Sequence, residues 1–380
     1  ALGDFDYNGF VDDDDVTLLG ALFDPSAPPL NSQAAPGAGE RLHSHVTSIP
    51  EPPSAMLALL MAIVVVAVRV YARSARCFVP LIAAYLITAS VARGDVFRWD
   101  NGELVPGTKG ITPGPGVQLT ERDLKFAQLW DMDLTGANFS RANLTDARFH
   151  QATMTNADFT GALVTGTMFF GLTSRGFTPE QFYSTASYQA KDLRRIILFD
   201  NDLTGWDFSA QNLDGADFTG ARLFGAKFSG AVVSGVNFEI TEITQEQLHS
   251  TASYQAKDLH GIGLIRLDLA GWDFAGQNLS GARFFDSNLI HADFTGATVS
   301  GANFESSGLS REQLYSTASY QAKDLQGTAL SRLNLAEWDF SEQDLTGANF
   351  RSATLSGASF VGRIIAGADF QDTTSHGFTK

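Results

Sequence analysis

Residues 134–149 read LTGANFSRANLTDARF, and this stretch decides the fold. Large apolar residues stand five positions apart in it, at Leu134, Phe139, Leu144 and Phe149. A small residue lies two positions before each of the last three, at Ala137, Ala142 and Ala147. A helix repeats every 3.6 residues and a strand every 2, so neither structure explains a period of five. The spacing indicates a chain in which every fifth side chain occupies an equivalent place.

The same period governs most of residues 122–372, in four blocks of ten centres. The blocks run from Leu124 to Phe169, from Leu193 to Phe238, from Leu259 to Phe304 and from Leu325 to Phe370. If five residues form one side of a square, four such units form a coil of about 20 residues, and stacked coils lie about 4.8 Å apart. The central Leu or Phe then points inward, and the residue two before it must be small because it lies near a corner.

The stretches GANFS, RANLT, GADFT and GANFE resemble the consensus of the pentapeptide-repeat family. The resemblance covers about two thirds of the chain and implies an all-β solenoid, a right-handed quadrilateral β-helix. Each buried Leu or Phe is expected to contribute about 1.5–3 kcal/mol. One coil cannot exclude water from its own stack, so the stability depends on contacts between neighbouring coils.

A longer period of 66 residues lies over the short one, because STASYQAKDL occurs at 184–193, 250–259 and 316–325. Each copy follows a capping-box pattern, Thr178 with Gln181, Thr244 with Gln247, and Ser310 with Gln313. We therefore expect short helical inserts near 174–192, 240–258 and 306–324, each interrupting a block of two and a half coils. The rod-facing residues of these helices are predicted to be Phe182, Leu248 and Leu314.

Residues 375–380 read SHGFTK and echo SRGFTP at 174–179, so we expect 373–380 to begin a fourth, truncated insert. Ala1 and Lys380 both fall within motifs, so we expect a fragment of a longer protein.

Two sets of recurring residues could be functional or structural. Trp206, Trp272 and Trp338 occupy the inward position that is otherwise small, and they could form an aromatic binding stripe or swing outward to cover the inserts. Lys-Asp pairs recur with a tyrosine at the 66-residue period, and this repetition favours packing and surface pairing over catalysis. The five histidines at 150, 249, 260, 291 and 376 share no metal-ligand spacing, and we predict no enzymatic activity.

Residues 4–15 read DFDYNGFVDDDD and have the spacing of a calcium-binding loop. Oxygen ligands fall where a cation with six to eight oxygens needs them, with Gly9 at the sharp turn. The predicted calcium ligands are Asp4, Asp6, Asn8, the carbonyl of Phe10, Asp12 and Asp15. A solvated acidic turn is the alternative. With the helix expected over 16–23, residues 1–23 resemble one half of a dockerin domain, which implies a cohesin-like partner.

Residues 24–54 form a Pro-, Ala- and Ser-rich linker that contains Pro-Glu-Pro at 50–52. Residues 55–76 begin with an uncharged apolar run to Val68 and end with Arg69, Arg73 and Arg76. This order resembles a PEP-CTERM sorting signal, which holds an exported protein in the membrane with its basic end inside.

Residues 77–92 have the layout of a secretory signal peptide, with cleavage expected after Ala92. Two interpretations remain open for 55–92: a fusion of two adjacent reading frames, or a hairpin of two membrane helices. Both predict that the lead-in at 93–121 and the repeats leave the cytoplasm, and both predict contact with the membrane through 55–92.

The composition limits the functions that remain. The formal net charge of −16 argues against nucleic acid as a partner of the whole surface. Cys77 is the only cysteine, so the chain has no intrachain disulfide and no cysteine-rich zinc site. No motif for a small-molecule substrate is found, and calcium is the only cofactor that we expect.

Three hypotheses follow. The first is a noncatalytic, exported structural or protein-interaction rod at the cell envelope or surface of a bacterium. The second comes from the resemblance: some cytoplasmic pentapeptide-repeat proteins imitate DNA and bind topoisomerases. Residues 94–380 carry 33 acidic and 21 basic residues, which fits this hypothesis, whereas export does not. The third is an accessory module of a surface polysaccharide-degrading system, attached through the dockerin-like segment.

Overall fold

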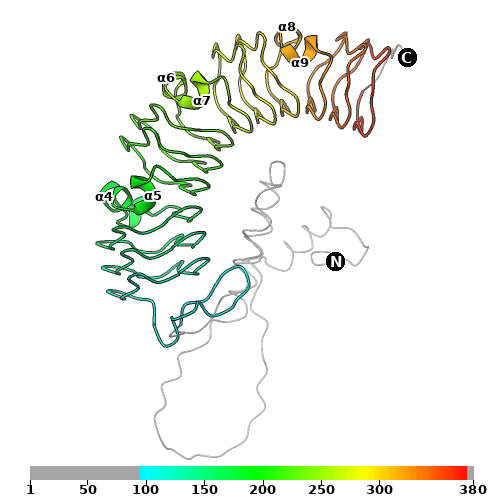
Figure 1. The fold of residues 1–380 in the computed structure, drawn as a ribbon. Helices are drawn as coiled ribbons and strands as arrows, with labels where there is room; N and C mark the ends of the chain where they lie inside the picture. The colour runs from blue at the N-terminus through cyan, green and yellow to red at the C-terminus, as the bar shows by residue number, and fades with distance from the viewer. Residues whose placement is uncertain (1–94, 375–380) are drawn as a thin grey trace, which may run out of the picture. The chain divides into compact units, whose positions relative to one another are not determined.

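The computed structural model describes residues 95–374, shown in colour in Figure 1. The chain divides into two compact units, Ala1–Thr88 and Ala89–Lys380, and the described residues lie in the second unit. They form a stack of four-sided coils that is joined at intervals by short helices.

Outside the inserts, parallel β-bridges join residues that are 20 positions apart, and four bridges occur in each turn of the chain. In the first turn the bridges are Gln118 to Asn138, Asp123 to Asn143, Gln128 to Arg148 and Asp133 to Thr153. Successive bridges start five residues apart, so each pentapeptide makes one side of a square. We number the sides by their central residues, with Leu124 on the first face, Leu129 on the second, Leu134 on the third and Phe139 on the fourth. The solenoid predicted from the five-residue period is confirmed.

Tight turns at the corners explain the remaining positions of the repeat. The backbone N–H of Ala142 donates to the carbonyl oxygen of Phe139 at 3.0 Å, and Arg141 between them has φ of 56°. A left-handed third residue is what a type II turn requires. The side-chain oxygen of Asn138 accepts the N–H of Ser140 at 2.9 Å, which is why Asp or Asn precedes so many centres.

The centres form four internal columns, and two of the columns are rich in phenylalanine. Phe139 and Phe159 lie on the fourth face of neighbouring coils and stack with ring centroids 5.3 Å apart. Phe149, on the second face, meets Phe139 edge-on at 5.3 Å. All three side chains are fully buried. Each ring therefore contributes its transfer free energy, about 1.5–3 kcal/mol, and a further 0.5–1.5 kcal/mol from ring geometry.

The core begins at Leu119, five residues before the first centre expected from the sequence. Residues 95–117 lie over this end of the stack. Phe97 pairs antiparallel with Leu104, and Arg98 pairs antiparallel with Ala127. Val96 and Val105, a hydrogen-bonded pair of this hairpin, are buried. The antiparallel strand occupies the free edge of the first coil, where an unpaired parallel strand would invite further pairing.

Six short α-helices and one 3₁₀ helix occur in the three inserts, and the helix pairs lie along the same side of the stack (Figure 1). The 3₁₀ helix η1 spans Thr173–Arg175. The α-helices are α4 (Pro179–Tyr183), α5 (Ala186–Gln189), α6 (Gln245–His249), α7 (Ala252–Gln255), α8 (Arg311–Tyr315) and α9 (Ala318–Gln321).

Each helix pair completes a coil, whereas the sequence predicted an interruption after two and a half coils. The second-face bridge from Asn237 continues to Gly263, 26 residues later, so the insert adds only six residues to one turn. Phe182 of α4 lies in the fourth-face column, with its ring centroid 6.1 Å from that of Phe208. Phe182, Leu248 and Leu314 are fully buried, as the sequence predicted. The helices thus replace two sides of every third coil while the core column continues.

Several predictions lie outside the described residues. They are the calcium loop within 1–23, the linker at 24–54, the apolar segments at 55–76 and 77–92, and all but the first two residues of 373–380. Between residues 95 and 374, the search for a helix long and apolar enough to cross a membrane found none.

Candidate interaction surface

The first helix of each insert begins with the capping box that the sequence predicted. In α4 the hydroxyl of Thr178 accepts the N–H of Gln181, and the side-chain oxygen of Gln181 accepts the N–H of Thr178 at 2.8 Å. The Gln181 amide nitrogen also donates to the carbonyl oxygens of Met154 and Ala157, at 2.9 and 2.7 Å. Gln247 and Gln313 repeat these contacts, so one glutamine caps the helix and ties it to the coil below.

The second helix replaces a bridge of the sheet with a serine hydroxyl. Ser187 in α5 is buried, and its Oγ accepts the N–H of Val164 at 2.9 Å. Ser253 and Ser319 accept the N–H groups of Val233 and Val299 at the same distance. A buried N–H without an acceptor costs about 1–3 kcal/mol. The serine of STASYQAKDL is thus part of the backbone hydrogen-bonding ladder.

Two tyrosines replace another bridge on the fourth face. Tyr188 Oη donates to the carbonyl oxygen of Asp207 at 2.8 Å, and Tyr183 Oη accepts the N–H of the same residue at 2.7 Å. Burial raises the pKa of Tyr188 to about 12, so this hydroxyl keeps its proton. Tyr254 and Tyr320 donate to Asp273 and Asp339 in the same way. The recurring tyrosines therefore serve packing, as their repetition indicated.

The recurring tryptophans cover the inserts. Trp206 is buried, with its ring centroid 5.4 Å from Phe182 and 6.1 Å from Tyr183. Trp272 and Trp338 are buried as well. An exposed aromatic stripe is therefore ruled out, and the packing alternative is confirmed for the described residues.

One set of residues was missed by sequence reasoning. Gln211 is fully buried at another position that is normally small, and its amide nitrogen donates to the carbonyl oxygen of Tyr188 at the end of α5 at 3.1 Å. Gln277 and Gln343 do the same for α7 and α9. The signal was available, because these glutamines break the small-residue rule at the period of 66.

One exposed segment of each insert is identical in the three copies. Gln, Ala and Lys at 189–191, 255–257 and 321–323 are all exposed. The lysines have φ between 59° and 62°. Lys191 and Lys257 lie over the rings of Tyr188 and Tyr254, at 5.2 and 5.3 Å from the ring centroids. We call these three surfaces the elbows. Each presents one lysine, and in the third elbow Lys323 forms an ion pair with Glu342.

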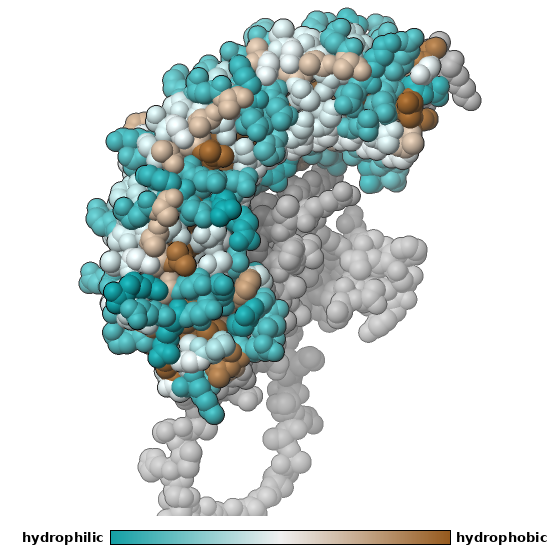
Figure 2. All heavy atoms as spheres, in the orientation of Figure 1, coloured by the Kyte–Doolittle hydropathy of each residue, from teal (hydrophilic) through white to brown (hydrophobic). Residues whose placement is uncertain are grey.

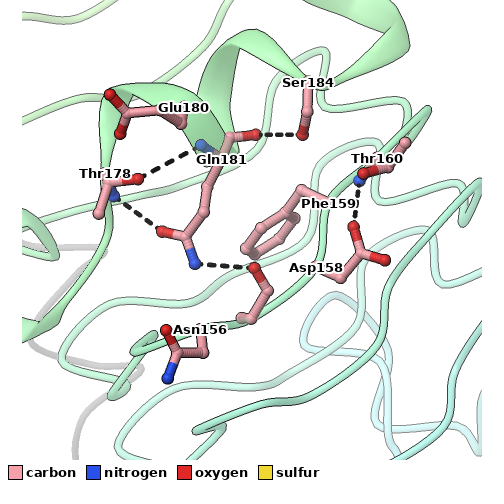
Figure 3. A pocket seen from close by; sticks show the side chains of 9 residues that line it. Asn156, Asp158, Phe159, Thr160, Thr178, Glu180, Gln181 and Ser184 are labelled. Carbon is pink, nitrogen blue, oxygen red and sulfur yellow. Dashed lines mark hydrogen bonds between the residues drawn. The ribbon is translucent and has the colours of Figure 1, made fainter.

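Beside α4 lies an open recess of about 390 Å³, shown in Figure 3. Asp158, Thr160, Glu180 and Ser184 are among the polar residues that line it. Asp158 accepts the N–H of Thr160 at 2.9 Å, which fixes its carboxylate at the rim. This recess is rich in hydrogen-bond acceptors and suits a donor from a partner. Lys227 replaces this aspartate in the second copy, whereas Asp293 occupies the same position in the third copy and accepts the N–H of Thr295 at 2.8 Å.

Outward positions of the fourth face carry a row of aspartates. The row consists of Asp158, Asp207, Asp273, Asp293 and Asp339, with Lys227 as its one cation among the described residues. Hydrogen bonds from Thr295 lower the pKa of Asp293, and those from Ser209 lower the pKa of Asp207. These two aspartates therefore stay ionised at neutral pH. Figure 2 shows a surface that is mostly polar, with separate apolar spots.

No group of three or more His, Cys, Asp or Glu side chains within 95–374 could hold a metal ion. The predicted ligands Asp4, Asp6, Asn8, Phe10, Asp12 and Asp15 all lie outside that range. His150, His249, His260 and His291 lie in different coils, and the structure brings no two of them together.

The stacked coils, continuous core and polar outer faces define a β-solenoid. The family model for pentapeptide repeats matches residues 123–161, 202–239, 268–305 and 324–362 in eight copies. The chain belongs to the pentapeptide-repeat family.

Solved structures of this family are similar over parts of the chain. HetL of the cyanobacterium Nostoc, a protein involved in the regulation of heterocyst differentiation, is 23% identical with a TM-score of 0.25, covering 67% of this chain and 89% of HetL. A protein of the Arabidopsis thaliana thylakoid lumen is 36% identical with a TM-score of 0.11, covering 29% of this chain and 68% of its own.

QnrB1, a plasmid-mediated fluoroquinolone resistance protein, is 13% identical with a TM-score of 0.15, covering 69% of this chain and 90% of QnrB1. These TM-scores are low, so the fold rests on the bridges and columns described above. A comparison with curated proteins found no match.

Proposed function

We propose that this protein is a noncatalytic interaction rod, exported to the envelope or surface of a bacterial cell. One observation carries the proposal: a continuous buried core runs from Leu119 to Phe360, and the repeated residues whose side chains are buried serve packing. The invariant residues of the inserts cap helices or replace bridges. The elbow glutamines donate to carbonyl oxygens of the preceding helices, so the lysines are the part of each elbow that suits a partner with acidic groups.

Export is supported by the two apolar segments at 55–76 and 77–92. The test is to purify the repeat protein from its native host and to determine its N-terminal residue by mass spectrometry. We expect Arg93, together with recovery from the envelope or the medium. Recovery of a cytoplasmic protein that retains residues 55–92 would contradict export.

The interaction role is tested by reversing the charge of the elbows. A variant with Lys191→Glu, Lys257→Glu and Lys323→Glu keeps the core, because all three lysines are exposed. We expect a loss of attachment to the cell envelope, measured by salt extraction of washed cells. Arg141→Glu, Arg222→Glu and Arg351→Glu change the charge equally outside the elbows and should leave attachment intact.

A second candidate function is favoured by the row of aspartates on the fourth face. Such a row could imitate the charge of a nucleic acid and bind a topoisomerase. The test is a DNA supercoiling assay with purified bacterial gyrase. Inhibition by the protein, lost in the Asp273→Asn, Asp293→Asn variant, would support this function. Equal supercoiling with and without the protein would exclude gyrase as the partner.

The third candidate, an accessory module of a surface polysaccharide-degrading system, depends on the dockerin-like segment at 1–23. It requires binding of the full chain to a cohesin domain in the presence of calcium. Binding that persists in the chelator EDTA would contradict a dockerin-type contact, because that contact needs the metal-ordered loop.

A further inference from the structure

A recess of about 230 Å³ lies where the N-terminal hairpin meets the second face of the solenoid. Its lining residues are Trp99, Asp146, Arg148, Gly166, Met168, Arg195 and Ile197. Trp99 comes from the hairpin, whereas Arg148, Met168 and Ile197 are the outward residues of three successive coils, joined by the bridges from Arg148 to Met168 and from Met168 to Ile197.

Trp99 is held in place from two sides. Its indole Nε1 donates to the carbonyl oxygen of Asp146 at 2.7 Å. The guanidinium carbon of Arg148 lies 3.4 Å from the centre of the indole ring. A stacked arginine keeps its five N–H donors in a fixed plane, with their edge free for a planar acceptor.

The charges of this recess do not balance. Arg195 Nη1 lies 3.5 Å from Asp146 Oδ1, so the single carboxylate is already engaged. Arg148 forms no ion pair and no side-chain hydrogen bond with any residue between 95 and 374. Its partial burial lowers its pKa from the ordinary value, because removing the cation from water costs free energy. A partly buried cation with free donors is a binding site for an anion.

The remaining lining of the recess is apolar. Met168 is buried and Ile197 is partly buried, and both lie beside the indole ring of Trp99 around the recess. The volume of about 230 Å³ equals about eight times the roughly 30 Å³ that a water molecule occupies in the liquid, which suits a ligand of about eight non-hydrogen atoms.

We propose that this recess binds a small organic carboxylate, with the carboxylate on the guanidinium edge of Arg148 and a short apolar chain against Trp99, Met168 and Ile197. The two carboxylate oxygens accept the parallel N–H groups of Arg148, a geometry that lysine could not offer. The site is independent of the elbows and of the acidic face.

The test is calorimetric titration of the full chain with hexanoate, which has eight non-hydrogen atoms. We expect saturable binding to one site with a Kd on the order of 1 mM. Hexanol and hexylamine, which keep the chain and change the head group, should show no saturation. Absence of saturation by hexanoate up to about ten times that Kd, or equal binding of hexanol, would overturn the proposal.

A pair of variants locates the site. Arg148→Met keeps the apolar stem and removes the charge, and should weaken hexanoate binding at least tenfold. Arg283→Met is the matched control, because Arg283 occupies the equivalent outward position two blocks later. It should bind hexanoate as the wild type does. Unchanged binding by Arg148→Met, with a retained β-solenoid circular dichroism spectrum, would place the ligand elsewhere and refute the assignment.

Discussion

The hydroxyl oxygen of Tyr183 lies 2.7 Å from the backbone nitrogen of Asp207 and accepts its N–H. Tyr315 accepts the N–H of Asp339 in the third insert, whereas the second insert has His249 at this position. The Nε2 atom of His249 is buried without a hydrogen-bond partner. A tyrosine hydroxyl has thus taken over a backbone bond in the first and third inserts, and the second insert lacks this bond.

We predict that His249→Tyr stabilises the protein, because the new hydroxyl would accept a backbone N–H in the second insert as it does in the other two. The expected gain is about 1 kcal/mol in the free energy of unfolding, measured by urea denaturation. Tyr315→His is the mirror-image control and should destabilise by a similar amount. A destabilised His249→Tyr variant would show that the second insert differs in its backbone as well.

Ile240 has φ of 55°, in the left-handed region that disfavours a β-branched residue. The equivalent residue of the first block is Gly171, with φ of 65° and open space around the position of a Cβ atom. We predict that Ile240→Gly stabilises by about 1 kcal/mol, since the strain is released and Ile240 is mostly exposed. Gly171→Ile should destabilise the protein by a comparable amount, and thermal unfolding of the wild type and both variants measures the two effects. Equal melting temperatures for all three proteins would contradict this account.

Two phenylalanines allow a core position to be compared with a surface position. Phe284 is fully buried between the rings of Phe274 and Phe294, whereas Phe224 is 78% exposed. We predict that Phe284→Ala costs about 3–5 kcal/mol, because it leaves a cavity in a column that cannot collapse. Phe224→Ala should change the stability by less than about 0.5 kcal/mol. Urea unfolding measures both values, and similar losses at the two sites would argue against a closed internal column.

Burial and the nearby guanidinium of Arg148 lower the pKa of His150 to about 4. The unfolded chain has a histidine pKa of about 6.5 and binds more protons between these two pH values. This contribution to stability is therefore complete above pH of about 6.5 and is lost as the pH falls toward about 4.

We predict that His150→Phe, which keeps a ring to stack on Trp130, melts with less dependence on pH than the wild type over this window. His291→Phe changes an exposed histidine and serves as the control. An unchanged pH profile in His150→Phe would show that another group dominates the acid response.

The loop at 4–15 is predicted to bind one calcium ion per chain with a Kd at or below about 1 mM, measured by calorimetry on the full chain. Asp4→Asn and Asp15→Asn remove charged ligands at the two ends of the loop and should weaken binding. Asp95→Asn lies outside the loop and should not. Heat from the double variant equal to that of the wild type would refute the assignment.

The period of five predicted the solenoid, the inward Leu and Phe residues and the corner positions, because each of these depends on residues close together in the chain. Capping boxes such as Thr178 with Gln181 were predictable for the same reason. The role of Ser187 was not, because its partner Val164 is 23 residues away and becomes a neighbour only when coils stack.

The sequence also did not predict that the core continues through the inserts. Leu248 is in a helix, outside the five-residue rhythm, yet it fills the same column as Phe228 and Phe274 because the helix turns it inward. Trp206 and Gln211 could be recognised in the sequence as large residues at positions where the repeat normally has a small one. The reason for these large residues is that both pack against the helix pair, and this contact can be recognised only in the three-dimensional structure. The recess at Arg148 depends on a hairpin that no repeat predicts.

The even return of the elbows has a consequence for recognition. They recur every 66 residues on one side, and the three coils between them correspond to a rise of about 14 Å. A partner with its own regular spacing, such as a polymer with acidic groups, could engage all three at once. The gain would come from effective concentration, which can raise avidity by about 10²–10⁴ without any new contact. The spacing of the elbows, more than the strength of any single contact, would then select the partner.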